Sequence, residues 1–244
     1  MTDCEHETAA PRVSFVIPAF NEEAILETAI NDLRARLKEV EFPAYEVIIS
    51  ENGSSDATLV TAAKLSRRYP DVRYISSREP NYGKAMKTGI LAARGDLVFC
   101  DEIDLCDINF HVRALDLLET GGADMVVGSK LLRGALDKRP WTRHAASIVF
   151  NGLLRAALGF RGTDTHGLKA FRRAPMLEVI DACLVDMDMF PSELVIRAER
   201  AGLRIVEIPV RVLEKRAPTF KLFTRVPNVI YNISKLFVAI RLKG

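Results

Sequence analysis

Apolar runs and helical stripes alternate through the first half of the chain. The segment 13–20, VSFVIPAF, is a short continuous apolar run, which predicts a buried strand. In segment 21–40 apolar residues recur every three or four positions, which predicts a helix with one buried face. We expect Asn21 to cap this helix and Ser55 to cap the next, because short polar side chains accept hydrogen bonds from free N–H groups at helix starts.

The same alternation continues to the middle of the chain. The further predicted strands are 45–50, 72–77, 96–101 and 123–129, and the further helices are 55–70, 82–95 and one around 112–119. Strands that are apolar throughout and alternate with helices indicate a parallel sheet covered on both faces. Ligands bind beyond the carboxyl ends of the strands in such sheets, and the polar clusters of this sequence follow those strand ends.

The second half is richer in helices and in basic residues. The sequence predicts helices at 142–160 and 190–202, strands at 167–173 and 203–216, and a basic amphipathic helix at 223–244. No linker, repeat or low-complexity segment interrupts residues 12–222, so we expect one domain there and a C-terminal helix packed on it or on a membrane surface. Residues 1–11 are polar, and we expect a disordered tail.

Composition excludes several classes of protein. Apolar residues make up 48% of the 244 positions and charged residues 27%, as in ordinary globular proteins. The net charge of +2 does not suggest a nucleic-acid partner, but the excess of Lys and Arg after Lys130 suggests an anionic ligand or surface on that side.

The chain also lacks the sequence signals of secretion and of membrane spans. No run approaches the roughly 20 apolar residues needed to cross a bilayer, and the first residues do not form a signal peptide. The four cysteines form no CxxC pair, which fits free thiols in a reducing compartment. We therefore expect a cytoplasmic protein, peripheral at the cytoplasmic face of a membrane if it meets one.

An acidic cluster, CDEIDLCD, follows the predicted strand at 96–101. Its carboxylates belong to Asp101, Glu102, Asp104 and Asp107. Ionised carboxylates repel one another and are costly to desolvate, so the cluster is either a solvated loop or the site of a cation. A carboxylate pair at a strand end can hold Mg²⁺ or Mn²⁺, which completes its coordination shell with substrate phosphates.

Seven motifs together resemble one known family. In order they are PAFNEE, SENGSSD, NYGKAMKTG, DEID, VVGSK, DTHGLKAFRR and GLRIVEIPV, within residues 12–222. Their order resembles the family-2 glycosyltransferases, and most of all the polyprenyl-phosphate (dolichol-phosphate) mannose and glucose synthases. The resemblance implies an α/β, Rossmann-like GT-A fold that binds nucleotide sugars, with a mostly parallel central sheet covered by helices. It also implies inverting, metal-dependent transfer of a hexose from a nucleoside-diphosphate sugar to a polyprenyl phosphate.

The resemblance assigns donor-binding roles to residues after the first three strands. They are Pro18, Ala19, Phe20, Glu22, Glu51, Gly53, Ser54 and Lys84. Glu51 replaces an Asp of the family, which leaves the base, guanine or uracil, open. Gly83 is expected to let the chain approach the ligand, and Lys84 to meet a phosphate.

The family's D-x-D metal motif reads E-x-D in this chain. Counted from Gly95, the triplet falls on Glu102-Ile103-Asp104. Two alternatives remain: Glu102 and Asp104 hold the Mg²⁺ or Mn²⁺ ion, or Asp101 joins Asp104. We favour the first and keep Asp101 as a residue close to the nucleotide.

The resemblance places the acceptor phosphate among basic side chains of the second half. The residues assigned there are Lys130, Arg143, Ser147 and Asp164, together with Arg216 and Lys221, which resemble a basic loop that closes over both the donor and the acceptor phosphates. Arg143 and Ser147 lie four positions apart on one predicted helix face, and Lys130 replaces an Arg of the family. His166 has no counterpart in the motif and is interpreted as a polar loop residue.

A phosphate acceptor is already an anionic nucleophile and needs no general base. A hydroxyl acceptor would need one, and Asp164 or Asp188 would be the candidates. Two alternatives therefore stay open: a transferase with a soluble sugar or metabolite acceptor, and a non-catalytic sugar-nucleotide-binding protein. A dinucleotide-dependent oxidoreductase is not indicated, because no GxGxxG follows the first strand. The oligomeric state is also open.

Overall fold

The computed structural model describes residues 10–138, 140–212 and 226–242, and side chains of the last range from residue 231 onward. The strands are β1 (Val13–Ala19), β2 (Tyr45–Asn52), β3 (Val72–Ser77), β4 (Leu97–Cys100), β5 (Met125–Ser129), β6 (Leu136–Asp137), β7 (Lys169–Arg172), β8 (Ile205–Pro209) and β9 (Arg211–Val212). The helices are α1 (Leu26–Glu39), α2 (Thr58–Arg68), α3 (Tyr82–Ala92), α4 (Ile108–Glu119), α5 (Trp141–Leu158), α6 (Arg173–Ala182), the short 3₁₀ helix η1 (Met187–Met189), α7 (Phe190–Arg200) and α8 (Val226–Arg241).

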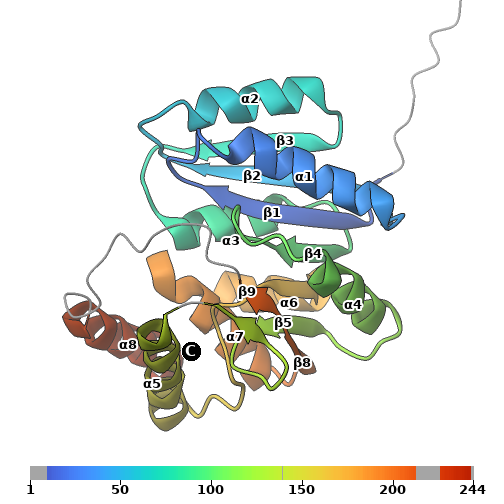
Figure 1. The fold of residues 1–244 in the computed structure, drawn as a ribbon. Coiled ribbons are helices and arrows are strands. Elements are labelled where there is room, and N and C mark those ends of the chain that lie inside the picture. Colours follow the sequence, from blue (N-terminus) through green and yellow to red (C-terminus); the bar gives the residue numbers. More distant parts are fainter. Residues whose placement is uncertain (1–9, 139, 213–225, 243–244) are drawn as a thin grey trace, which may run out of the picture.

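Seven strands form one central sheet in the order β3-β2-β1-β4-β7-β5-β8 (Figure 1). Neighbouring strands are parallel except at β7, which runs antiparallel to both β4 and β5. The prediction of a mostly parallel sheet is confirmed, and β7 is the exception to it. Strands β6 and β9 form a separate parallel pair outside this sheet.

Helices cover both faces of the sheet, and the strands bury both of their faces. Side chains alternate between two hydrophobic clusters: Phe15 packs with α1, α2 and α4, whereas its neighbour Val16 packs with the helices of the other face. Both side chains are fully buried. This two-sided burial explains why the strands appear as continuous apolar runs in the sequence.

The first two loops hold each other, and this corrects both predicted helix caps. Asn21 adopts a left-handed backbone with φ of 53°. Its Oδ1 accepts a hydrogen bond from the backbone N–H of Ser55 at 2.9 Å. In return, the N–H of Glu22 donates to Oγ1 of Thr58 at 2.7 Å. Helices α1 and α2 therefore begin later than predicted, at Leu26 and Thr58, because the polar residues bridge the loops instead of capping.

Gly83 lies in close contact with the short helix η1. A Cβ at this position would lie 2.7 Å from the backbone N and O of Met187. The N–H of Met187 also donates to Oδ1 of Asn81, the N-cap residue of α3, at 3.0 Å. Gly83 thus lets η1 pack on the start of α3, and its approach to a ligand stays a prediction.

Helices α5 and α8 lie side by side at the end of the molecule opposite α1 and α2 (Figure 1). Arg200 of α7 joins them, because its guanidinium donates to the carbonyl of Leu158 at 2.9 Å and to that of Ile240 at 3.1 Å. Across the described ranges, no helix combines the length and the apolar character that a bilayer crossing requires.

A buried carboxylate, Glu46, ties three strands together at the amino ends of the sheet. Its Oε1 accepts from the Ser14 hydroxyl at 2.7 Å and from the Arg94 N–H at 2.8 Å, and its Oε2 accepts from Arg73 Nε at 2.6 Å. Burial raises the pKa of Glu46, but these hydrogen bonds outweigh burial and leave the pKa below its ordinary value. The network lies far from the strand ends at which the polar loops gather.

We expect Glu46→Gln to lower the free energy of unfolding by about 1–3 kcal/mol at neutral pH, because the buried donors lose a charged acceptor. A lowered folded-state pKa stabilises the fold above the unfolded-state value of 4.5, and this contribution is lost as the pH falls through the folded-state value. The difference between wild type and variant should therefore shrink in acid. Urea denaturation from neutral pH to about pH 3 measures it.

The control is Glu27→Gln, which removes an exposed pairing with Lys64 at 3.1 Å and Arg68 at 3.3 Å. It should cost about 0.5 kcal/mol or less at any pH. Equal effects of the two variants would contradict a stabilising role for the Glu46 network.

Candidate functional site

Two pockets open at the carboxyl ends of the strands and meet at Glu102 and Asp104. The first, here the β1 pocket, is lined by Pro18, Ala19, Phe20, Glu22, Asn52, Tyr82, Glu102, Ile103 and Asp104. The second, here the β5 pocket, is lined by Glu102, Asp104, Leu105, Gly128, Lys130, Arg143, His166, Gly167, Val210 and Val212. A ligand in one pocket would therefore lie next to a ligand in the other, with the two carboxylates between them.

The residues after β4 alternate between the core and the pockets. Asp101 and Ile103 are buried, whereas Glu102 is exposed and Asp104 is partly exposed. A turn closes behind them, since the N–H of Leu105 donates to the carbonyl of Glu102 at 3.0 Å. Asp101 and Ile103 pack inward, and Glu102 and Asp104 are left on the outer side of this turn.

Asp101 forms a buried pair with His111 of α4. Its carboxylate oxygens lie 2.8 and 3.0 Å from Nε2 of His111, and both side chains are completely buried. The imidazole is surrounded by aromatic rings, of which Phe15 is 5.1 Å and Phe99 is 5.8 Å away between centroids. The structure therefore places Asp101 in the core, away from both pockets, and not beside a nucleotide as predicted.

The last carboxylate of the acidic cluster, Asp107, caps α4. Its Oδ1 accepts from the N–H of Asn109 at 3.0 Å, and its Oδ2 accepts from the N–H of Arg211 at 3.2 Å. Of the four carboxylates, Glu102 and Asp104 remain directed to the pockets.

Glu102 and Asp104 supply oxygen ligands of the kind that Mg²⁺ and Mn²⁺ prefer. The pKa of Glu102 is raised, first because the surrounding protein desolvates its carboxylate and then because Asp104 repels its charge. A divalent cation between the two carboxylates would relieve this repulsion, so the donor set fits such an ion. Within the described ranges, no group of three or more His, Cys, Asp or Glu side chains is placed to hold a metal. An ion held here would need further oxygens from a ligand or from water.

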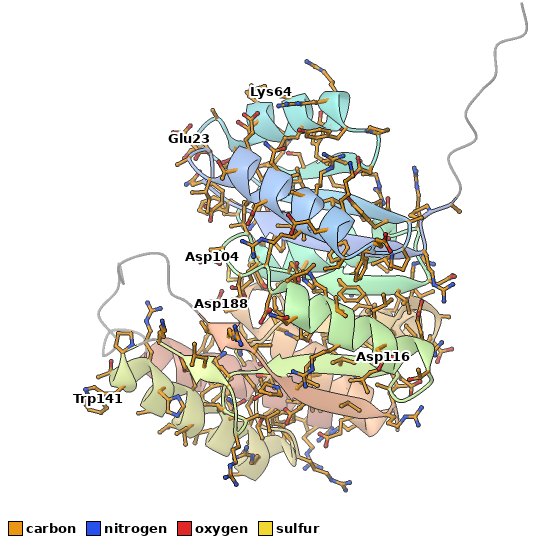
Figure 2. All side chains as sticks on the ribbon, turned by 45° about the vertical axis from the view of Figure 1, so that its right-hand side comes forward. Glu23, Lys64, Asp104, Asp116, Trp141 and Asp188 are labelled. Carbon is orange, nitrogen blue, oxygen red and sulfur yellow. The ribbon has the colours of Figure 1, made fainter. Side chains whose placement is uncertain are left out.

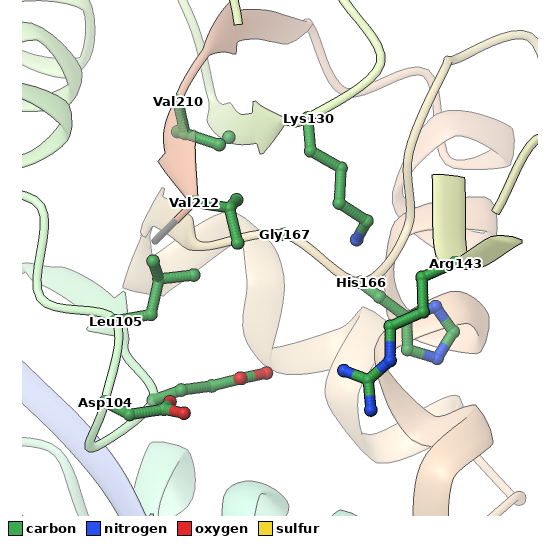
Figure 3. Close-up of a pocket in the computed structure, with 10 residues that line it drawn as sticks. Asp104, Leu105, Lys130, Arg143, His166, Gly167, Val210 and Val212 are labelled. Carbon is green, nitrogen blue, oxygen red and sulfur yellow. The ribbon is translucent and has the colours of Figure 1, made fainter. Parts of the chain in front are cut away.

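Lys130 and Arg143 lie across the β5 pocket from Asp104 (Figure 3). Lys130 follows β5 and Arg143 lies in the first turn of α5, so two separate elements bring positive charge to the pocket. Leu105, Val210 and Val212 form an apolar wall on the same side of the pocket as Asp104 (Figure 3). The pocket thus combines carboxylate and apolar side chains on one side with cations on the other.

Asp164 supports Lys130 and does not line either pocket. Its carboxylate lies 3.0 Å from Nζ of Lys130 and accepts from the N–H of His166 at 3.0 Å. Burial raises the pKa of Asp164, but the charge of Lys130 and these hydrogen bonds outweigh it and lower the pKa below its ordinary value. Asp164 is therefore ionised and paired, and it holds Lys130 at the pocket.

Ser147 lies one turn after Arg143 on α5, as predicted, but its hydroxyl is engaged within the helix. Oγ donates to the carbonyl of Arg143 at 3.0 Å. Ser147 does not line the β5 pocket. The Ser147 hydroxyl thus contacts the backbone of Arg143, which itself lines the pocket.

His166 lines the β5 pocket with both ring nitrogens engaged. Nε2 lies 3.0 Å from the carbonyl oxygen of Asp188 and therefore carries the proton, which leaves Nδ1 to accept from the Thr165 hydroxyl at 3.2 Å. The pKa of His166 is lowered to about 4, first by burial and then by the charges of Lys169 and Lys130. His166 is thus a neutral residue in the wall of the β5 pocket. The resemblance to the family had assigned no role in the site to it.

The β1 pocket contains half of the residues predicted for the donor. Pro18, Ala19, Phe20 and Glu22 line it. Glu51, Gly53, Ser54 and Lys84 do not, and each has another position in the structure. These positions explain why four residues of the motifs lie outside the pocket.

Glu51 is buried and accepts hydrogen bonds from the Ser54 N–H at 2.5 Å and from the Ser76 hydroxyl. Gly53 forms the turn with φ of 68°, and Ser54 Oγ accepts from the N–H of Asn21 at 3.1 Å. Lys84 is exposed on the first turn of α3. These residues shape the loops behind the pocket, and none of the four lines it.

Asn52 and Tyr82 line the β1 pocket and were not predicted to do so. Asn52 lies between Glu51 and Gly53 of the SENGSSD motif, so its position next to two motif residues was the available signal. Arg216 and Lys221, the predicted basic loop, lie outside the described residues.

Comparison with known proteins identifies the family. The model of "Glycosyl transferase family 2" matches residues 14–180. The "Glycosyltransferase AglD" of Haloferax volcanii is 32% identical over 83% of this chain, and the matched region is 33% of AglD. The "Polyprenol monophosphomannose synthase" of Mycolicibacterium smegmatis is 27% identical over 86% of this chain and 81% of its own length. The chain thus spans only a third of AglD but most of the synthase.

A solved structure shows the same fold. The glucosyl-3-phosphoglycerate synthase of Mycobacterium tuberculosis, in complex with Mn²⁺, UDP-glucose and phosphoglyceric acid, superposes with a TM-score of 0.66. The match covers 94% of this chain and 80% of that one, at 22% identity. The fold is therefore the predicted GT-A type. The family match, which extends from β1 to α6, shows that this chain belongs to glycosyl transferase family 2.

Proposed function

We propose that this glycosyltransferase moves a hexose, mannose or glucose, from a nucleoside-diphosphate sugar to a polyprenyl phosphate, with inversion at the anomeric carbon. The observation that carries the proposal is that Glu102 and Asp104 line both pockets. A diphosphate in the β1 pocket and an anionic acceptor in the β5 pocket would meet at these carboxylates.

The β1 pocket receives the donor. Its apolar residues at the end of β1 face the nucleoside, and its carboxylates lie at the end of β4, where the diphosphate belongs. The related synthase structure is a complex with Mn²⁺ and UDP-glucose, which supports a nucleotide sugar with a divalent metal ion as the donor. In this chain Glu102 and Asp104 would hold the Mg²⁺ or Mn²⁺ ion, whose chemistry is to neutralise the charge of the departing nucleoside diphosphate.

The β5 pocket receives the acceptor phosphate. Lys130 and Arg143 provide the cations that a phosphate needs, and the apolar wall of Leu105, Val210 and Val212 suits the first isoprene units of a lipid. The synthase relative at 27% identity makes polyprenol monophosphomannose by its name, which supports this acceptor class.

The side chains in and behind the β5 pocket support an acceptor that is already ionised. Asp164 is paired with Lys130, and both nitrogens of His166 are hydrogen-bonded within the protein. A phosphate oxygen can attack the anomeric carbon without losing a proton, while the bond from that carbon to the nucleotide's phosphate oxygen breaks. A hydroxyl acceptor would instead need a general base.

A soluble anionic acceptor is the second candidate. The solved relative carries phosphoglyceric acid beside UDP-glucose, and Lys130 and Arg143 would suit such an anion as well. The two candidate acceptors differ in their products, because a lipid-linked product enters the organic phase and a soluble one stays in water. They also differ in whether the reaction needs a general base.

The exposed face of α5 supports a lipid acceptor. Trp141, Ile148, Val149 and Leu153 are 80%, 50%, 61% and 43% exposed, and they lie on the same side of the helix at helical spacing. Figure 2 shows Trp141 at the outer edge of the molecule. A helix with such a face on a monomeric protein is unusual unless it contacts a partner or a bilayer.

Helix α8 adds apolar and basic side chains beside α5. Tyr231, Phe237 and Val238 are 57%, 40% and 40% exposed, and Lys235 and Arg241 are exposed as well. Apolar side chains flanked by cations suit the interface of an anionic membrane. Because Arg143 of the β5 pocket lies in the first turn of the same helix α5, a docked membrane would lie near the acceptor site.

We expect Glu102→Gln and Asp104→Asn each to reduce hexose transfer at least about 100-fold, because each removes one of two carboxylates that hold the metal and its diphosphate. The assay incubates the protein with radiolabelled GDP-mannose or UDP-glucose, Mn²⁺ or Mg²⁺, and a short polyprenyl phosphate. Label in the organic phase supports the proposal. Label only in a water-soluble product with phosphoglycerate supports the soluble acceptor.

Asp101→Asn is the matched control, since it changes the buried neighbour of the same loop. It should lower the midpoint of urea denaturation, whereas the two pocket variants should leave that midpoint nearly unchanged. Nucleotide binding by the wild type without any turnover would contradict the proposal and indicate a binding protein instead.

We also expect the double variant Ile148→Gln, Val149→Gln to weaken binding to vesicles rich in phosphatidylglycerol by about tenfold, because it removes two side chains from the inserted face. Co-sedimentation with the vesicles measures this. The control Val60→Gln changes an equally apolar side chain, 70% exposed on α2 at the other end of the molecule, and should bind as wild type. Unchanged binding of the double variant would exclude the α5 face as the contact.

A further inference from the structure

The carboxylate of Glu207 on β8 holds the loop that precedes β7. Its Oε1 accepts hydrogen bonds from the backbone N–H of Thr163 at 2.7 Å and of Asp164 at 3.1 Å, and its Oε2 accepts from the Thr163 hydroxyl at 2.9 Å. Glu207 is partly buried and lines neither the β1 pocket nor the β5 pocket. Because hydrogen bonds to a carboxylate are strong, Glu207 fixes the backbone of residues 163–164.

Gly162 lets this loop approach Glu207 closely. A Cβ at this position would lie 2.8 Å from Oε1 of Glu207 and 2.6 Å from the ring of Phe160. The carbonyl of Gly162 also accepts two hydrogen bonds from the Arg155 guanidinium, at 3.0 and 3.2 Å. The loop is thus held between β8 and α5, the helix that also carries Arg143.

Asp164 connects Glu207 to the side chain of Lys130. Its N–H donates to Glu207, and its carboxylate lies 3.0 Å from Nζ of Lys130. Asp164 is buried, so water does not replace either contact. A shift of the backbone at residues 163–164 would therefore displace the counter-ion of Lys130.

A second path leads from Glu207 to the backbone on either side of Lys130. The Thr163 hydroxyl donates to Glu207, so its oxygen accepts from the hydroxyl of Ser129 at 2.6 Å. Oγ of Ser129 in turn accepts from the N–H of Leu131 at 3.2 Å. Since Ser129 and Leu131 flank Lys130, this chain of hydrogen bonds holds the turn that presents Lys130 to the β5 pocket.

Resting on the proposed function, we propose that Glu207 is a positioning residue for the acceptor, because it holds Lys130 where the acceptor phosphate binds. Strand β8 lies at the edge of the sheet, and β5 and β7 separate it from β4, which precedes the carboxylates proposed to hold the metal. Loss of Glu207 should therefore weaken the binding of the acceptor and leave the binding of the sugar nucleotide unchanged.

Two variants of Glu207 separate positioning from general stability. Glu207→Ala removes all three hydrogen bonds to the loop. Glu207→Gln keeps an oxygen for the two N–H groups, and its NH₂ group can donate to the oxygen of Thr163. Glu46→Ala is the matched control, since Glu46 also accepts from a hydroxyl and a backbone N–H, those of Ser14 and Arg94, but lies at the amino ends of the sheet.

The experiment measures kcat and both KM values for transfer from GDP-mannose or UDP-glucose to a short polyprenyl phosphate with Mn²⁺. We expect Glu207→Ala to raise the KM for the polyprenyl phosphate about tenfold or more and to change the KM for the sugar nucleotide less than about twofold. Glu207→Gln should restore the acceptor KM to within about threefold of wild type. Glu46→Ala should lower the midpoint of urea denaturation and leave both KM values unchanged.

A double-mutant cycle tests whether Glu207 acts through Lys130. In a Lys130→Ala background, Glu207→Ala should raise the acceptor KM less than about twofold further, because the group that it positions is already absent. An undiminished tenfold effect in that background would show a different path and overturn the inference.

The outcomes distinguish this inference from the proposed function. If the wild type transfers hexose but Glu207→Ala leaves the acceptor KM unchanged, or raises both KM values equally, Glu207 is structural and the inference fails alone. If the wild type transfers hexose to no polyprenyl phosphate, the proposed function fails and the inference fails with it.

Discussion

The burial of one carboxylate determines the geometry of the site. Asp101 enters the core because His111 meets it there, among rings that exclude water. With Asp101 and Ile103 packed inward, the turn after β4 leaves Glu102 and Asp104 on its outer side. A buried pair of this kind is costly to break, so the direction of the two pocket carboxylates is coupled to the stability of the fold.

Other parts of the site are held by hydrogen bonds between side chains and backbone groups behind the β1 pocket. Asn81 makes several of these hydrogen bonds. Its Oδ1 accepts from the N–H of Lys84 and from the N–H of Met187, both at 3.0 Å. Its own N–H donates to Asn52, so one residue joins β2, α3 and η1. A pocket built this way is largely formed before a ligand arrives, which reduces the ordering cost of binding.

The sequence predicted the sheet better than the site, for a physical reason. Strands buried on both faces can be recognised in the sequence as continuous apolar runs. Strand direction depends instead on long-range pairing, so the antiparallel direction of β7 was not predicted. Polar residues at loop starts have several possible partners. Asn21 was expected to cap a helix and instead bridges to Ser55, and Glu51 was expected in the pocket and instead accepts from Ser54. The partners of such side chains are decided by tertiary structure, which local pattern does not contain.

The charges of the β5 pocket indicate the charge of the ligand that it would bind. Lys130 already has a buried counter-ion, Asp164, so its charge is stabilised without any ligand. Such an arrangement holds the cation in place and leaves its remaining N–H groups for a second anion. The neutral His166 beside it adds neither charge nor a free ring nitrogen. These features support the proposed phosphate acceptor, which needs no general base, over a hydroxyl.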